Sequence, residues 1–152
     1  MLGWSMAISS ASEIPFLLFS AQIFKRISVS FIFIVAALAA ALRWFLFSQI
    51  EVAHWMLPVQ VLHGLIFIVL SVTIAIIINR EVPPEWKASG QTLNGLLSLG
   101  AARIIGSFLG GILSAAYGMR QVFLYSSYVS IGCVVVFGAV LFLRRNQTKL
   151  GM

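Results

Sequence analysis

The chain has 152 residues, of which 61% are hydrophobic and only 9% are charged. Soluble domains carry about 25% charged residues, so this composition excludes an ordinary soluble protein and predicts a membrane protein. The net charge of +6 does not indicate a nucleic-acid partner, because the basic residues fall at the ends of apolar stretches instead of forming a patch.

Five apolar stretches follow one another, each near the roughly 20 residues that a helix needs to cross a bilayer. They predict an all-α membrane protein built as one membrane domain over residues 1–152. The predicted transmembrane helices are 2–24, 29–49, 53–79, 90–117 and 122–143. Between the third and the fourth, the paired prolines Pro83 and Pro84 stop a helix.

The loops that join these stretches differ in charge. One side collects seven basic residues, which are Lys25, Arg26, Arg80, Lys87, Arg144, Arg145 and Lys149, whereas the other side holds only Arg120. Cytoplasmic loops carry the excess of Lys and Arg. The sequence therefore predicts a multi-pass protein of the inner (plasma) membrane, with its amino terminus outside and its carboxyl terminus in the cytoplasm.

Four ionisable residues interrupt the apolar stretches: Glu13, Arg43, His63 and Arg103. A charge at the bilayer centre costs about 2.5–3.5 kcal/mol on insertion scales, so such groups usually face a protein interior or a water-filled cavity. From the helical rise of 1.5 Å, Glu13 lies about 18 Å from the cytoplasmic ends, and the other three lie roughly 24–25 Å from them. This shared layer predicts one water-accessible site built by several helices.

Each of these residues also has a plainer interpretation. Glu13 can lie at a helix end, since the nearby Pro15 suits a helix start as well as a kink, and Arg43 can extend to the outer interface. His63 can be a satisfied packing histidine. Gln60, one turn earlier, adds a second polar group to the same helix face.

Arg103 lies in a helix that also carries a stripe of small residues at intervals of four. The stripe consists of Ala102, Gly106, Gly110, Ser114 and Gly118. Such a stripe lets helix backbones approach closely and is most simply a packing face. Because Arg103 lies beside it, a structural ion pair is an alternative to a ligand-binding role.

Several chemistries lack their residues in this sequence. His54 falls at a loop, so His63 has no second histidine to form a haem site, and the single cysteine, Cys133, supplies neither an intrachain disulfide nor a metal cluster. Neither a phosphate-binding Gly-Lys-Ser/Thr loop nor a Gly-x-Ser-x-Gly elbow occurs. We therefore expect no enzyme activity, no metal and no cofactor.

Four short motifs carry a family resemblance. In chain order they are Ser12-Glu13-Ile14-Pro15, Leu42-Arg43-Trp44, Leu62-His63-Gly64 and Val82-Pro83-Pro84-Glu85. Together they resemble the carboxyl-terminal half of a major facilitator superfamily transporter, of the branch that contains lactose permease and the phenylpropionate-permease-like proteins. The resemblance extends over almost the whole chain and implies that the five stretches are helices 8–12 of that fold.

What the resemblance implies for function is specific. In proton-coupled sugar porters of this type, a carboxylate, an arginine and a histidine line the central cavity, and these positions match Glu13, Arg43 and His63. The chain is thus expected to belong to a proton-coupled symporter for a small polar or anionic organic solute, such as a sugar, a nucleoside or an aromatic acid. It has Gln60 and Ile66 where the lactose-permease pattern has a lysine and a second carboxylate, so lactose is not the expected substrate and Glu13 is the candidate proton carrier.

The number of helices limits what the chain does alone. Transporters of this type have two six-helix halves with the site between them. We therefore expect a fragment, a split gene product or an internal start that needs its missing amino-terminal helices or a partner chain. The alternative is a small non-transporting five-helix subunit that oligomerises through its glycine-rich helix, with the buried charges paired between subunits.

Overall fold

A computed structural model describes residues 2–150, without the side chains at positions 2, 21, 23–25, 53, 68 and 144–150. All elements in this part of the chain are helical, which confirms the predicted all-α class. They are α1 (Leu2–Arg26), α2 (Val29–Gln49), η1 (Ala53–Trp55), α3 (Met56–Val59), α4 (Val61–Glu81), η2 (Pro84–Trp86), α5 (Lys87–Gly95), η3 (Leu96–Ala101), α6 (Ala102–Tyr117) and α7 (Met119–Leu150).

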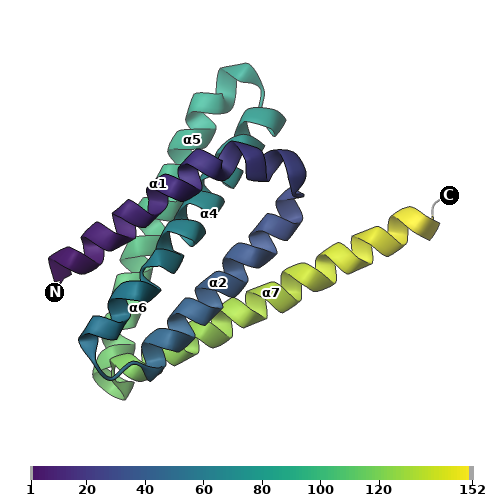
Figure 1. Ribbon diagram of the computed structural model, residues 1–152. Coiled ribbons are helices and arrows are strands. Elements are labelled where there is room, and N and C mark those ends of the chain that lie inside the picture. The colour runs from purple at the N-terminus through teal and green to yellow at the C-terminus, as the bar shows by residue number, and fades with distance from the viewer. Residues whose placement is uncertain (1, 151–152) are drawn as a thin grey trace.

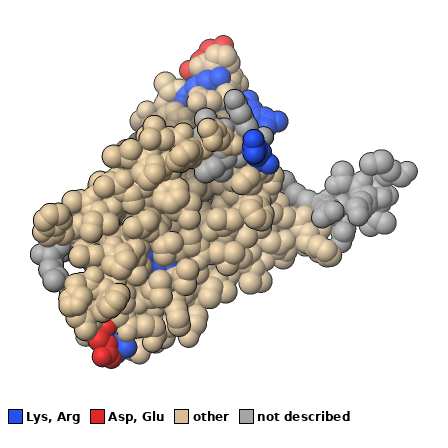
Figure 2. Space-filling model, viewed as in Figure 1, with Lys and Arg blue, Asp and Glu red and all other residues tan. Residues whose placement is uncertain are grey.

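The helices run alternately up and down (Figure 1). The α1–α2 and α4–α5 connections lie at one end, and the α2–α3 and α6–α7 connections lie at the other. Figure 2 shows most of the charged side chains on this face at these two ends, as expected of a bilayer-spanning protein, and a small blue patch within the broad tan band between them. The side chains of Lys25, Arg144, Arg145 and Lys149, on which the predicted orientation partly depends, lie outside the described residues.

Four segments are long and apolar enough to cross a bilayer, namely Val29–Gln49, Met56–Glu81, Pro84–Tyr117 and Met119–Leu143. Among the described residues α1 does not join them, although its 25 residues give it the length. Five serines and Glu13 make α1 more polar than the others. The first predicted span therefore stays a prediction.

The helix boundaries differ from the predicted ones in four places. Pro15 lies inside α1 and not at its start. The helix predicted at 53–79 is broken at Gln60, between α3 and α4. The helix predicted at 90–117 begins earlier, at Pro84, and changes to a π-helical turn at η3. The last helix begins at Met119, directly after Gly118, whose φ of 82° suits a residue without a side chain.

Small and aromatic residues pack α2 against α7. Ala41 lies buried on α2, and its carbonyl accepts a hydrogen bond of 2.9 Å from the buried Ser127 hydroxyl of α7. Trp44 stacks on Phe123 with 5.6 Å between the ring centroids. On its other side, α2 meets α4 in a small apolar cluster around Ala36. Since alanines permit close approach, α2 packs closely between α7 and α4, and it carries one of the predicted site residues, Arg43.

Candidate solute-binding cavity

A polar cavity of about 380 Å³ lies between α1, α2, α4 and α6. Its lining consists of Ser5, Met6, Ser9, Ser10, Glu13, Arg43, Gln60, His63, Phe67 and Arg103. All five residues that the sequence singled out therefore face one space, although they come from four parts of the chain. Most of the helical surface around them is apolar, so the cavity concentrates the ionisable groups of the membrane-spanning region.

Glu13 and His63 face each other across the crossing of α1 and α4. Glu13 Oε1 lies 3.9 Å from His63 Nε2, and the two side chains are 28% and 33% exposed. The imidazole also stacks on Phe67, one turn further along α4, with ring centroids 5.8 Å apart. The stacking on Phe67 thus holds the imidazole of the pair in place, and both side chains remain partly exposed to the cavity.

A close backbone contact sets the distance between α1 and α4 at this point. Gly64 is buried, and a Cβ added to it would lie 2.5 Å from the carbonyl carbon and oxygen of Ser12. Only glycine permits that approach. Because Ser12 precedes Glu13 and Gly64 follows His63, the same contact holds the carboxylate next to the imidazole.

Arg43 reaches into the cavity from α2 and is already engaged there. Its Nη2 donates a hydrogen bond of 2.8 Å to the side-chain oxygen of Gln60, whose amide nitrogen in turn donates to the Ser5 hydroxyl. The guanidinium carbon also lies 5.0 Å from the ring centre of Trp44 and 5.1 Å from that of Phe47, within cation–π range. Its buried Nε has no hydrogen-bond partner among the described residues.

Arg103 faces the cavity from the first turn of α6. Among the described residues no carboxylate lies within 4.0 Å of its guanidinium, so the structural ion pair considered from the sequence does not form in this part of the chain. The glycine stripe of α6 is open as well: a Cβ at Gly106 or Gly110 would meet nothing within 4 Å. Gly106 and Gly110 therefore pack on no described helix of this chain.

A second, more apolar cavity of about 520 Å³ adjoins the first. The two share Arg43, His63 and Phe67, which form the wall between them. The second cavity extends toward Leu70 on one side and Asn94 on the other. A ligand at the shared wall thus has charged groups on one side and mainly apolar ones on the other.

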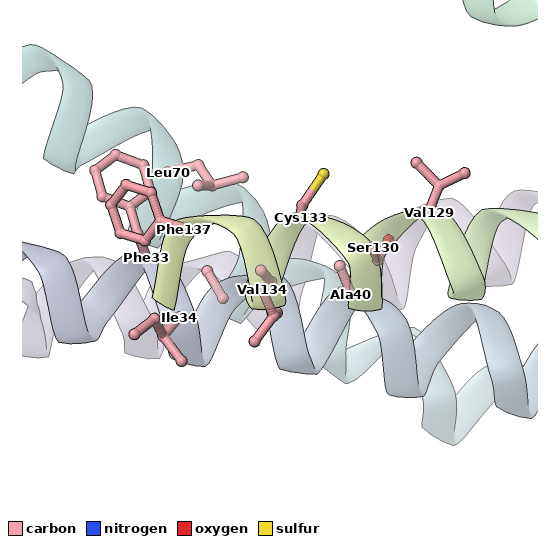
Figure 3. A pocket seen from close by; sticks show the side chains of 11 residues that line it. Phe33, Ile34, Ala40, Leu70, Val129, Ser130, Cys133, Val134 and Phe137 are labelled. Carbon is pink, nitrogen blue, oxygen red and sulfur yellow. The ribbon is translucent and has the colours of Figure 1, made fainter. Parts of the chain in front are cut away.

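A third space, of about 340 Å³, lies along α2 and α7 and has a different character (Figure 3). It is lined by apolar side chains such as Phe33, Val134 and Phe137, together with the Ser130 hydroxyl and the Cys133 thiol. None of its described lining residues is charged. Within the described residues no cluster of three or more His, Cys, Asp or Glu side chains is arranged to hold a metal ion.

Sequence reasoning missed two contributors to the polar cavity. The first is the serine face of α1, where Ser5, Ser9 and Ser10 line the cavity beside Glu13. The spacing of four between Ser5 and Ser9, and again between Ser9 and Glu13, places these residues on one helix face and was a usable signal. The second is Gly64, whose role depends on a contact with a distant helix.

Comparison with known protein families adds the decisive observation. The model of the MFS_1 like family matches residues 1–125, which include every lining residue of the polar cavity. The chain belongs to this family. It is therefore a member of the major facilitator superfamily, a group of multi-pass membrane transporters rather than enzymes. No solved structure matches the chain.

Proposed function

We propose that this chain forms one wall of the substrate pathway of a proton-coupled symporter, and that the polar cavity binds a small polar or anionic organic solute. The observation that carries the proposal is the convergence of Glu13, Arg43, Gln60, His63 and Arg103 on one cavity. Such groups are costly in a bilayer and are typical of substrate and ion pathways. Family membership supports a transport role.

The cavity supplies both kinds of hydrogen-bonding group that such a solute requires. The two guanidinium groups are donors only, the Glu13 carboxylate is an acceptor, and Gln60 and His63 provide both. A sugar or nucleoside would use the mixture, whereas an organic acid would place its anion on a guanidinium.

Glu13 is the proposed proton carrier. It supplies the one carboxylate among the lining residues of the polar cavity, and it lies 3.9 Å from His63 Nε2. Protonation of Glu13 removes the negative charge by which its carboxylate attracts the imidazole and the nearby guanidinium groups. Binding of solute and binding of a proton are thereby coupled, because each changes the charge that the other meets.

The proposal includes further helices that face this wall. In major facilitator proteins the site lies between two halves, and here α6 has no buried residue. We also propose that the end with Arg26, Arg80 and Lys87 is cytoplasmic in the inner (plasma) membrane, which is supported by the positive-inside rule and by the position of Arg120 at the other end.

A second candidate is the self-associating subunit. It is favoured by one observation, the open space beside Gly106, Gly110 and Gly111 on α6. In this case G106L together with G110L converts an oligomer in lipid nanodiscs into a monomer, as measured by mass photometry. A wild-type chain that is already monomeric rejects it.

Access of water to the cavity tests the main proposal. In a background where Cys133→Ser removes the only cysteine, Ser9→Cys places a thiol in the polar cavity and Ser130→Cys places one in the apolar space along α7. Charged methanethiosulfonate reagents should modify the thiol at position 9 much faster than that at position 130. One of three solutes, glucose, uridine or benzoate, should slow the first reaction. Equal rates at the two positions would reject a water-filled cavity.

Proton coupling requires a separate measurement. When the protective solute is added to nanodiscs in weakly buffered solution, a pH dye should report proton uptake by the wild-type chain. Glu13→Gln should abolish the uptake. Glu51→Gln is the matched control, because Glu51 lies outside the cavity, paired with Arg120 at 3.5 Å. Unchanged uptake in the Glu13 variant removes this residue from the mechanism.

A further inference from the structure

We propose that Arg103 is the anion-binding residue of the polar cavity, and that it selects solutes with an anionic group over neutral solutes of the same shape. This inference rests on the proposed binding of solute in the cavity, and it gives Arg103 a ligand-binding role in place of a structural one. Three independent observations support it: the geometry of η3, the partners of the other charged groups, and the extent of the cavity.

The π-helical turn η3 brings Arg103 onto the cavity face. Gln91, Asn94 and Ser98 follow one another on one face of α5 and η3 and line the second cavity. In a continuous α-helix, Ser98 and Arg103 would point about 140° apart. In η3 the backbone bond instead joins residues five apart, from the Ala102 N–H to the Leu97 carbonyl, so side chains five apart approach the same face. Arg103 is thereby turned toward the side of Ser98, and it lines the polar cavity that adjoins the one lined by Ser98.

The other charged groups of the cavity already have partners. Glu13 faces His63 at 3.9 Å, and Arg43 donates to Gln60 at 2.8 Å and lies against two aromatic rings. Within the described part of the chain, Arg103 is not in an ion pair. The lining of the cavity contains one carboxylate and two guanidinium groups, so the cavity keeps a positive charge when Glu13 is ionised and His63 is neutral.

A guanidinium in this setting suits an anionic group of a small organic molecule. Its planar donors match a carboxylate with two parallel hydrogen bonds, and its charge is present at every physiological pH. The cavity also continues past the wall formed by Arg43, His63 and Phe67 into the more apolar space. A ligand that fits this cavity places its anionic group on Arg103 and its less polar part against Phe67.

The test compares two thiol reagents of opposite charge. In the Cys133→Ser, Ser9→Cys chain in nanodiscs, rates are measured with the anionic sulfonatoethyl and the cationic trimethylammonioethyl methanethiosulfonate. The ratio of the two rates cancels changes in the reactivity of the thiol itself. We expect the anionic reagent to be favoured and its rate to saturate with concentration, which shows binding before reaction.

Arg103→Gln should lower the anion-to-cation ratio about tenfold and abolish saturation, since charged clefts raise local counter-ion concentrations by factors of ten or more. Arg103→Lys should keep most of the ratio, because it keeps the charge. Arg120→Gln, which removes a cation at the end of the bundle, should leave the ratio unchanged.

The outcomes separate this inference from the proposed function. Failure of both reagents to modify position 9 rejects the water-filled cavity itself. If both reagents modify position 9 and the anion-to-cation rate ratio is the same in Arg103→Gln as in the parent, only the role of Arg103 is overturned. If Arg103→Gln does not fold, the Arg103→Lys variant decides. If the rate of its reaction with the anionic reagent saturates as strongly as in the parent, a site fitted to a guanidinium is overturned. If that saturation is weaker while the anion-to-cation rate ratio is retained, the site is supported.

Discussion

The α1–α4 crossing and the α2–α7 crossing are built from different kinds of residue. At the first, Gly64 lies against Ser12, and Glu13 faces His63 within a polar cavity. At the second, aromatic rings pack along the interface, as in the stacked pair Trp44 and Phe123. The apolar crossing therefore spreads its contacts over several aromatic and small residues, whereas the polar crossing depends on a few specific contacts.

Gly64→Ala should produce the largest effect on folding. Its Cβ would overlap the Ser12 backbone, which cannot move aside as a flexible side chain can. Overpacking of this kind costs about 1–3 kcal/mol, and we expect a loss near the upper end because backbone atoms are involved. Reversible unfolding in mixed micelles, followed by tryptophan fluorescence, measures the loss.

Gly106→Ala is the matched control for this prediction. A Cβ at Gly106 meets nothing within 4 Å, and alanine is the better helix former by about 1 kcal/mol, so this variant should be as stable as the parent or slightly more stable. Equal stability of the two alanine variants would contradict the tight α1–α4 contact.

Gln60→Leu should have the next largest effect, at the same polar crossing. The leucine removes the acceptor for Arg43 and the donor to Ser5. Hydrogen bonds to charged groups contribute about 1.5–3 kcal/mol, and the partial exposure of these groups favours the lower end. Gln49→Leu changes an exposed glutamine that bonds only to its neighbour Ser48, so it should cost much less. A similar loss in both variants would show that Gln60 does not hold Arg43.

The all-helical class and the ionisable residues of the cavity could be predicted from the sequence because each depends on local information. A run of apolar residues specifies a helix in a bilayer, and the cost of a buried charge indicates which side chains need a polar surrounding. The helix geometry that turns Arg103 toward the cavity could not be predicted this way. In a regular α-helix of 3.6 residues per turn, Arg103 points away from Ser98. The π-helical turn η3 brings the two toward the same side, and it has no recognised signal in the sequence.

The role of Gly64 was hidden for a different reason. Glycines occur throughout α6 without packing on any described helix, whereas the single glycine of α4 forms the tight contact. Small residues in a sequence therefore indicate where close approach is permitted, and only the fold shows where it takes place. The same argument applies to the stripe through Gly106 and Gly110, which is open in this chain.

Ser127→Ala should have a smaller effect, and it tests the apolar crossing. Its buried hydroxyl donates to the Ala41 carbonyl at 2.9 Å, the kind of interhelical bond that averages about 0.6 kcal/mol in membrane proteins. The loss of stability should be of that size, because the aromatic contacts around it remain. Ser114→Ala, whose hydroxyl bonds to Gly111 of the same helix, should be nearly neutral. A loss above about 2 kcal/mol for Ser127→Ala would show that this crossing also depends on a single polar contact.

Glu51→Gln should have the smallest effect, although it removes an ion pair at the exposed end of the α2–α7 crossing. Glu51 Oε1 lies 3.5 Å from Arg120 Nη1, with the side chains 76% and 56% exposed. Exposed pairs contribute about 0–1 kcal/mol. Arg120 is also held by its hydrogen bond of 2.6 Å from Nε to the Ser48 carbonyl, which the substitution leaves in place.

Salt dependence separates the two contacts of Arg120. Raising the salt from about 0.1 M to 1 M shortens the Debye length from about 10 Å to about 3 Å. It should therefore remove any difference in stability between Glu51→Gln and the parent. If a large difference in stability between Glu51→Gln and the parent persisted at high salt, the contacts of Glu51 at the end of the bundle, and not the aromatic interface, would hold α2 against α7. Agreement with the expected small, screened effect would leave the polar crossing at Gly64 as the place where single substitutions matter most.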